Sequence, residues 1–461
     1  MKKIILVVLI AISMKANAQE ELTMRFLPQL QESGWAMPCN RTDAKISFGL
    51  PMLSSTSVHL FSNGFTYHDL FKNVGDTTYL QLGNVINQLK TNNFVGFGMT
   101  TSLFNFNYTG RKISVGFFIN LKTVSQFTYP GDLFKLLWNG NGPYLGQTMQ
   151  IGNFGLNAMA YTEYGLHFST TYKKKWTFGI NPKLLFGKFD INTQNTSVTL
   201  YTDPNYYQMT ANANLNIQTS GIPDSAQQND SKYLKSLIFN TANKGFALDF
   251  AAKYQYRDNI SFAAGINDLG FINWKSNITN YTSNISNVNF DGFHAENFFQ
   301  NDTSTDYSTK NYTDSLKKKL QLVKNYNNYS TAIPINFYAM ATYEIGIHHK
   351  FSAQFNWYSF ANNQSRALSL CYQLKLGKHL SVAATYTGKS RSPFNLGGGL
   401  IFQFLNMQWY FVTDNWWAAV KPLDSKNVNL RFGMNIVFGD ANKKYDEASK
   451  IPMEELKEEK K

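Results

Sequence analysis

The last regular stretch of the chain, residues 427–438, places the strongest constraint on the fold. All of its even-numbered residues are apolar, and all of its odd-numbered residues except Val437 are polar or glycine. Side chains alternate between the two faces of a β-strand, so the pattern predicts a strand with one completely apolar face. At about 3.3 Å per residue and a tilt of about 40°, such a strand crosses the apolar layer of an outer membrane. We interpret it as the closing strand of a transmembrane barrel.

The composition favours the same fold class. Hydrophobic residues make up 43% of the chain and aromatic residues 15%, whereas charged residues make up only 16%. The mean hydropathy of -0.31 is too low for a protein that crosses a membrane with helices. It is typical of a barrel, because polar residues that face the lumen offset the apolar residues that face lipid.

The N-terminus carries the features of a cleaved export signal. Lys2 and Lys3 precede an apolar run, and Ala16-Asn17-Ala18 is a small-x-small cleavage site, so residues 1–18 are predicted to be a signal peptide. No other run reaches the ~18 apolar residues that a transmembrane helix needs. We therefore expect a protein of the cell outer membrane, in contact with outer-membrane lipid.

The positive charge of the chain does not indicate a nucleic-acid partner. The formal net charge is +13, and a basic surface could bind nucleic acid or anionic lipid. The basic residues, however, are scattered in turns such as residues 173–175 and are not interleaved with aromatic residues. We expect no nucleic-acid partner.

Fourteen segments between residues 45 and 438 are strand candidates. They are residues 45–50, 94–107, 111–124, 160–172, 176–189, 246–257, 260–267, 335–347, 351–360, 367–376, 380–387, 396–404, 407–413 and 427–438. Tight turns follow every even-numbered strand, and most of the other connections are long. Short periplasmic turns and long extracellular loops alternate in this way in outer-membrane barrels. The sequence predicts an all-β, antiparallel transmembrane barrel of about 14 strands over residues 45–438.

The parts outside these strands are less regular. Residues 19–44 show no sustained period and are either periplasmic or folded into the barrel mouth as a plug. Residues 439–461 form a charged periplasmic tail that could recruit a periplasmic protein partner. Within the long connections the sequence predicts helices at residues 85–90 and 313–324, and a hairpin above the membrane formed by residues 197–201 and 207–217.

Both ends of the mature chain carry motifs that resemble a known family. At the C-terminal end these are residues 408–410 (QWY), 413–415 (TDN) and 426–433 (KNVNLRFG), and near the start they are residues 49–51 (GLP) and 62–67 (SNGFTY). They resemble a Bacteroidota outer-membrane barrel family that carries only a domain-of-unknown-function label. The resemblance implies an architecture similar to long-chain fatty-acid transporter (FadL-type) barrels, whose N-terminal segment plugs the lumen. It implies no established biochemical activity.

Charged and titratable residues on the polar strand faces are the candidate lumen site. They are Lys112, Glu163, His167, Lys183, Asp249, Lys253, Glu344, Lys375 and Arg431. These groups could bind or select a solute, or they could pair with one another in a filled barrel, which is the interpretation we favour. Glu163 and His167 lie four residues apart on one strand, about 13 Å from each other, which is too far to share a metal ion.

The two cysteines allow two interpretations. Cys371 has the lumen phase of its strand, and Cys39 belongs to the N-terminal segment. A disulfide between them would join that segment to the wall in an oxidising periplasm. Two free thiols are the alternative, and we favour it.

Tryptophans near the predicted strand ends suggest an interfacial girdle. Trp176, Trp357 and Trp409 have the lipid-facing phase, and aromatic residues at that depth are typical of membrane barrels. Trp416 and Trp417 lie in an outer loop, where they are expected to cover the rim.

No motif for catalysis, a metal ion or a cofactor stands out. Gly388-Lys389-Ser390 lacks the earlier glycine of a phosphate-binding loop, because that position is Ala383. We expect no enzyme, no metal and no cofactor. The leading hypothesis is passive transport of a hydrophobic or small amphipathic compound. The alternative is a structural or secretion-accessory barrel that acts through its loops and periplasmic tail.

Overall fold

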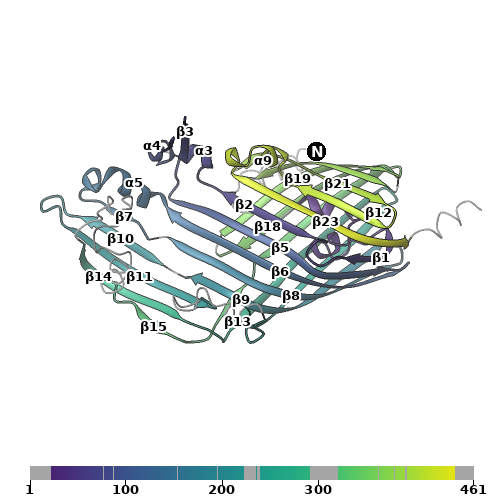
Figure 1. Cartoon of the computed structure of the whole chain (residues 1–461), viewed down its shortest axis with the longest axis horizontal. Coiled ribbons are helices and arrows are strands. Elements are labelled where there is room, and N and C mark those ends of the chain that lie inside the picture. Colours follow the sequence, from purple (N-terminus) through teal and green to yellow (C-terminus); the bar gives the residue numbers. More distant parts are fainter. Residues whose placement is uncertain are drawn as a thin grey trace, which may run out of the picture.

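A closed antiparallel β-barrel forms the body of the protein (Figure 1). The computed structural model describes residues 22–75, 77–86, 88–152, 154–194, 196–222, 235, 239–290, 320–361, 363–377, 379–389 and 392–441. The wall runs β1 (Ala44–Gly49) with β2 (Thr56–Ser62), β5 (Asn92–Thr109), β6 (Ile113–Pro130), β8 (Gly155–Tyr172), β9 (Trp176–Thr193), β12 (Lys244–Arg257), β13 (Ile260–Trp274), β17 (Ile335–Ile345), β18 (His349–Phe360), β19 (Asn363–Leu376), β20 (Leu380–Lys389), β21 (Ser392–Phe404), β22 (Met407–Thr413) and β23 (Asn427–Asp440). Because β1 and β2 lie end to end between β23 and β5, they count as one strand of the wall, and the predicted 14-strand barrel is confirmed.

The barrel closes through a strand that is interrupted in the middle. Both β1 and β2 pair with β23 on one side and with β5 on the other. Residues 51–93, which the strand candidates at residues 45–50 and 94–107 leave as one long connection, therefore include the wall strand β2, so that expectation is wrong. Pro51 lacks the N–H group that a ladder needs, which breaks the strand. The bulged backbone is still held, because Met434 N donates to Leu53 O at 2.9 Å and Ser102 N to Ser55 O at 2.8 Å.

The predicted alternation of faces is present in the wall. Leu166, Leu184 and Leu370 point outward and are 55%, 58% and 51% exposed, whereas Asn181 and Ser169 in the opposite phase are completely buried. A water-soluble protein buries its large apolar side chains. This barrel buries polar ones and exposes apolar ones, so hydrocarbon is the solvent that suits its outer face. No helix in the described part of the chain has the length and hydropathy to cross a membrane.

The same sheet continues beyond one end of the barrel, where β9 pairs with additional strands (Figure 1). The predicted hairpin is confirmed as β10 (Ser197–Thr202) and β11 (Met209–Ser220). It is flanked by β7 (Thr148–Gln150), β14 (Asn280–Phe290) and β15 (Val323–Asn325), and β16 (Tyr329–Ala332) pairs with β13. We call this end, which carries the long loops, the outer end, and the opposite end the turn end.

The remaining elements lie in the outer loops. They are α3 (Tyr67–Leu70), the hairpin of β3 (Phe71–Val74) and β4 (Thr77–Leu80), α4 (Leu82–Ile86), α5 (Gly131–Asn139), η2 (Gly142–Tyr144), α9 (Trp416–Val420) and η3 (Pro422–Asp424). The helix predicted at residues 85–90 thus begins three residues earlier and is short. Most of the helix predicted at residues 313–324 lies outside the described residues, and its last two residues belong to β15.

Candidate functional site

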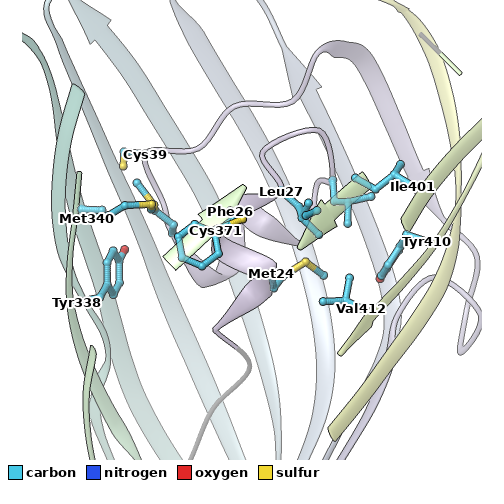
Figure 2. Packing of buried hydrophobic residues seen from close by; sticks show 14 residues of the cluster. Met24, Phe26, Leu27, Cys39, Tyr338, Met340, Cys371, Ile401, Tyr410 and Val412 are labelled. Carbon is cyan, nitrogen blue, oxygen red and sulfur yellow. The ribbon is translucent and has the colours of Figure 1, made fainter. Parts of the chain in front are cut away.

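Residues 22–43, which we call the insert, fill the inside of the barrel. The insert contains two single helical turns, η1 (Thr23–Phe26) and α2 (Ser33–Ala36). Leu22, Leu27 and Leu30 are fully buried. Figure 2 shows the insert between Tyr338 and Met340 on one side of the wall and Tyr410 and Val412 on the other. The lumen is therefore apolar at this level, and the insert supplies the complementary apolar side chains.

Asp414 holds the outer end of the insert. This buried carboxylate accepts hydrogen bonds from Leu22 N at 3.1 Å, Thr23 N at 2.9 Å and Thr23 Oγ1 at 2.6 Å. Asn429 Nδ2 donates to the same carboxylate at 2.7 Å and fixes its orientation. Because Asp414 accepts three hydrogen bonds from the insert, it is the attachment with the most hydrogen bonds at this end.

A set of inward-facing asparagines holds the rest of the insert. They are Asn105 of β5, Asn181 of β9, Asn267 of β13, Asn356 of β18 and Asn435 of β23. Asn105 and Asn435 accept from Gln31, Asn356 accepts from Arg25, and Asn435 also donates to Glu32. Asn181 donates to Gly34 O, and Asn267 donates to Trp35 O and Ala36 O. A carboxamide both donates and accepts, so one residue type can satisfy the backbone and the side chains of the insert. Sequence reasoning missed this role. The available signal was an asparagine at the lumen phase of five strands.

Glu32 is a buried carboxyl group of the insert. Burial raises the pKa of its carboxyl to about 7. Hydrogen bonds such as the one from Asn435 and the positive charge of Arg431 lower the pKa, but their effect is smaller. Its Oε2 accepts from Asn435 Nδ2 at 3.0 Å. Charging Glu32 near neutral pH therefore works against docking of the insert.

A compact group of ion pairs lies on the wall beside the insert. Lys183 Nζ is 2.7 Å from Asp249 Oδ2 and 2.7 Å from Asp268 Oδ1, and 3.8 Å from Glu163 Oε2. Lys122 Nζ is 3.1 Å from Glu163 Oε2 and 3.2 Å from Asp268 Oδ2. We call these five residues the ion cluster. Three of them were predicted lumen residues, whereas Lys122 and Asp268 were not selected.

A cavity of about 130 Å³ separates the insert from the ion cluster. Glu32 and Trp35 line it from the insert, and Asn120, Tyr161 and Asn267 are among the residues that line it from the wall. Its surface combines charged groups, carboxamides and aromatic rings. It can therefore hold a small molecule that is neither purely apolar nor purely ionic.

A model of the family described as "Family of unknown function (DUF5723)" matches residues 38–414. The chain belongs to the DUF5723 family. The match covers most of the barrel wall and the last part of the insert. The resemblance to a barrel family with a domain-of-unknown-function label is confirmed at this level, whereas the Bacteroidota origin stays a prediction.

Solved structures similar to the DUF5723 barrel include the P. putida toluene transporter TodX, at 9% sequence identity and a TM-score of 0.38 over 87% of this chain and 93% of that chain. A Pseudomonas aeruginosa FadL homologue matches at 9% identity and a TM-score of 0.42, over 93% of this chain and 100% of that chain. No curated protein matches the sequence.

Three of the other predicted lumen residues of the DUF5723 barrel lie at different positions along the wall. His167 is buried against the insert beside Gly34, with Nδ1 2.8 Å from Asn181 Oδ1. Arg431 lines the cavity and donates to Ser55 Oγ at 2.8 Å. Lys253 is half-buried on β12.

Three predicted lumen residues lie near the turn end of the barrel. Lys375 Nζ is 2.5 Å from Asp43 Oδ2, and Glu344 Oε1 is 3.9 Å from Lys350 Nζ. Lys112 is exposed in the bend before β6. The prediction that Lys112 faces the lumen is wrong, because the tight turn ends the strand alternation before the chain re-enters the wall.

The disulfide between Cys39 and Cys371 is absent, and both residues are buried free thiols. The backbone at Cys39 passes so close to Gly179 of β9 that a Cβ there would lie 2.5 Å from Cys39 N. Cys371 belongs to β19, which lies further round the wall. The insert is therefore attached to the wall by packing and hydrogen bonds, without a covalent link.

Both thiols are expected to resist iodoacetamide in the folded barrel and to react after unfolding. Burial raises the pKa of the Cys39 thiol to about 12, so little reactive thiolate forms. Mass spectrometry of the protein alkylated before and after unfolding measures this directly. Detection of a Cys39–Cys371 linked peptide without reduction would contradict the expectation.

The predicted rim tryptophans divide between the wall and an outer helix. Trp176 and Trp409 are 40% and 36% exposed on the outer face of the wall. Trp416 packs against Phe411 with ring centroids 5.3 Å apart, and Trp417 is exposed. Among the described residues there is no group of three or more His, Cys, Asp or Glu residues that could hold a metal ion.

Proposed function

We propose that the DUF5723 barrel lies in the outer membrane and passes a small amphipathic compound, with the insert as its plug. The observation that carries the proposal is the cavity between the insert and the ion cluster. A barrel that served only as a support would gain most by packing this space completely. The proposal gives the protein a transport role and assigns it no catalytic chemistry.

The attachment of the insert supports a plug that can move. Most of its anchors are hydrogen bonds to Asp414 and to the wall asparagines. Each hydrogen bond contributes about 1 kcal/mol, and water can replace it when the insert shifts. A plug held in this way can loosen at one point without loss of the barrel.

A structural or secretion-accessory barrel is the second candidate function. The extension of the wall favours this candidate, because β7, β10, β11, β14 and β15 continue the sheet well beyond the barrel (Figure 1). Such a surface could bind another macromolecule, and the tail predicted at residues 439–461 could bind a periplasmic partner. This candidate predicts that the barrel conducts nothing whether or not the insert is present.

Conductance in planar lipid bilayers tests the proposal. The mature protein is expected to be closed, because the insert fills the lumen. Deletion of residues 19–40 is expected to produce a stable open channel, since the wall strands and the anchor of Asp43 remain. Asp414→Ala is expected to give brief openings, because it removes the hydrogen bonds to Leu22 and Thr23.

Asp424→Ala is the matched control, because Asp424 lies in an outer loop and contacts His68 rather than the insert. It is expected to stay closed. If the deletion variant folds, as judged by heat-modifiable migration in gels, and still conducts nothing, the transport proposal is rejected in favour of the structural one.

A further inference from the structure

Three oxygen atoms around the cavity lack a hydrogen-bond partner among the described residues. They are Glu32 Oε1, Asn120 Oδ1 and Asn267 Oδ1, and all three residues line the cavity. Their side chains are nearly completely buried, with 1%, 1% and 4% exposure. A buried acceptor without a donor costs about 1–3 kcal/mol. The cavity therefore suits an occupant that brings several O–H or N–H donors.

The hydroxyl of Tyr410 meets this need only in part. Tyr410 is a hydrogen-bonding neighbour of Glu32 and lowers the pKa of the carboxyl, but its hydroxyl has a single proton and also donates to Ser54 O at 2.7 Å. The amide nitrogens of the two asparagines are also engaged, since Asn120 Nδ2 donates to Glu163 Oε1 at 2.8 Å and Asn267 Nδ2 to Ala36 O at 2.8 Å. The missing partners of the two asparagine oxygens are donors specifically, and the same holds for Glu32 Oε1 when its carboxyl is ionised.

The charges around the cavity favour a neutral occupant. Lys122 and Lys183 are both in contact with carboxylates of the ion cluster, and Arg431 donates to Ser55 and Ser57. A charged ligand would have to displace one of these contacts, which leaves a buried charge without its partner. A neutral ligand leaves all of them in place.

The size and the aromatic walls of the cavity narrow the choice further. A cavity of about 150 Å³ can hold benzene. This cavity measures about 130 Å³, so it can hold a group of roughly that size or slightly smaller. Trp35, Tyr161 and Tyr358 line it, and their ring faces suit C–H groups. Together with the three acceptors, these rings fit a short carbon chain that carries hydroxyl groups.

We infer that the cavity binds a small neutral compound with several hydroxyl groups, either free or as the headgroup of a larger amphipathic molecule. The inference rests on the proposed function for its place in transport, and it names the chemistry of the solute. Hydroxyl hydrogens are donated to Glu32, Asn120 and Asn267, and the carbon chain lies against Trp35 and the tyrosines.

Saturation-transfer NMR of the mature barrel in lipid nanodiscs tests the inference. The probes are glycerol, erythritol and the monobutyl ether of glycerol, compared with propylammonium and propionate of similar size. The three hydroxylated probes are expected to bind saturably, and the two ions at least about tenfold more weakly, which corresponds to the loss of roughly one well-placed hydrogen bond. Tighter binding of the butyl ether than of glycerol identifies an amphipathic headgroup as the source, and equal binding identifies a free polyol.

Substitutions of Glu32 separate this chemistry from a cation site. Glu32→Met removes the acceptor and is expected to weaken erythritol binding about tenfold. Glu32→Gln keeps a carbonyl acceptor without the charge and is expected to bind erythritol as the unmodified protein does. The matched control is Gln126→Met, because Gln126 is also buried with an unpartnered Oε1 among the described residues, and it does not line the cavity.

Two results would overturn the inference. One is binding of propylammonium that Glu32→Gln abolishes, which would identify a cation site. The other is no saturation transfer to any probe in the unmodified barrel, which would identify a cavity filled by water alone. Neither depends on whether Glu32→Met folds. If the variant that lacks residues 19–40 conducts and the mature barrel binds no polyol, the proposed function is retained and this inference is lost. If that variant folds without conducting and the mature barrel binds polyols, this inference is retained and the proposed function is lost.

Discussion

Replacing Lys183 by methionine is expected to lower the free energy of unfolding of the barrel by about 3–5 kcal/mol. Lys183 is 2% exposed and contacts Asp249, Asp268 and Glu163. Without this ammonium group, Asp249 loses its contact with Lys183, whereas Glu163 and Asp268 keep their contacts with Lys122. Removal of one partner from a buried ionic group is costly because the charges that remain are still out of water.

Urea unfolding of the refolded barrel in lipid, followed by tryptophan fluorescence, measures this loss. Lys375→Met is the control, because the Lys375 side chain is 37% exposed and pairs with Asp43 near the turn end. Exposed pairs contribute less than about 1 kcal/mol. Equal losses for the two variants would mean that water reaches the ion cluster and screens it.

The docked insert is expected to become less stable as the pH rises from 5 to 8. The ordinary pKa of the Glu32 carboxyl is 4.5, and burial raises it to about 7 in the docked state. Between these values the released insert loses the proton and the docked insert keeps it, so docking weakens as the pH rises and levels off above pH 7. A difference of this size corresponds to about 3 kcal/mol.

Arg431 and the Tyr410 hydroxyl also face Glu32, and both favour its charged form. Both therefore offset part of the rise in pKa that burial causes, and the value of about 7 includes their effect. Hydrogen exchange of the backbone amides of residues 22–36 at several pH values measures docking. In Glu32→Gln this pH dependence is expected to disappear. Persistence of the full effect in that variant would assign it to another group.

The wall could be predicted from the sequence because alternation is a local property. In β23, Phe432 and Phe438 are exposed and Asn429 and Asn435 are buried, as the pattern requires. The tight turns and the hairpin of β10 and β11 follow from neighbouring residues in the same way. The break in the first strand also had a local cause, Pro51, but the return of the chain to the wall as β2 did not.

The sequence by itself determined the fold class and the face of most wall residues, since these depend on a period of two and on the solvent of each face. Only the tertiary structure decided that the insert fills the lumen and that Lys122 and Asp268 meet Lys183 and Glu163. It also decided that Asp414, which follows a strand in the sequence, binds Leu22 and Thr23. Leu22 and Asp414 are separated by 392 positions. Closure of the barrel brings such residues together, and no local pattern records which inward side chains will then face each other.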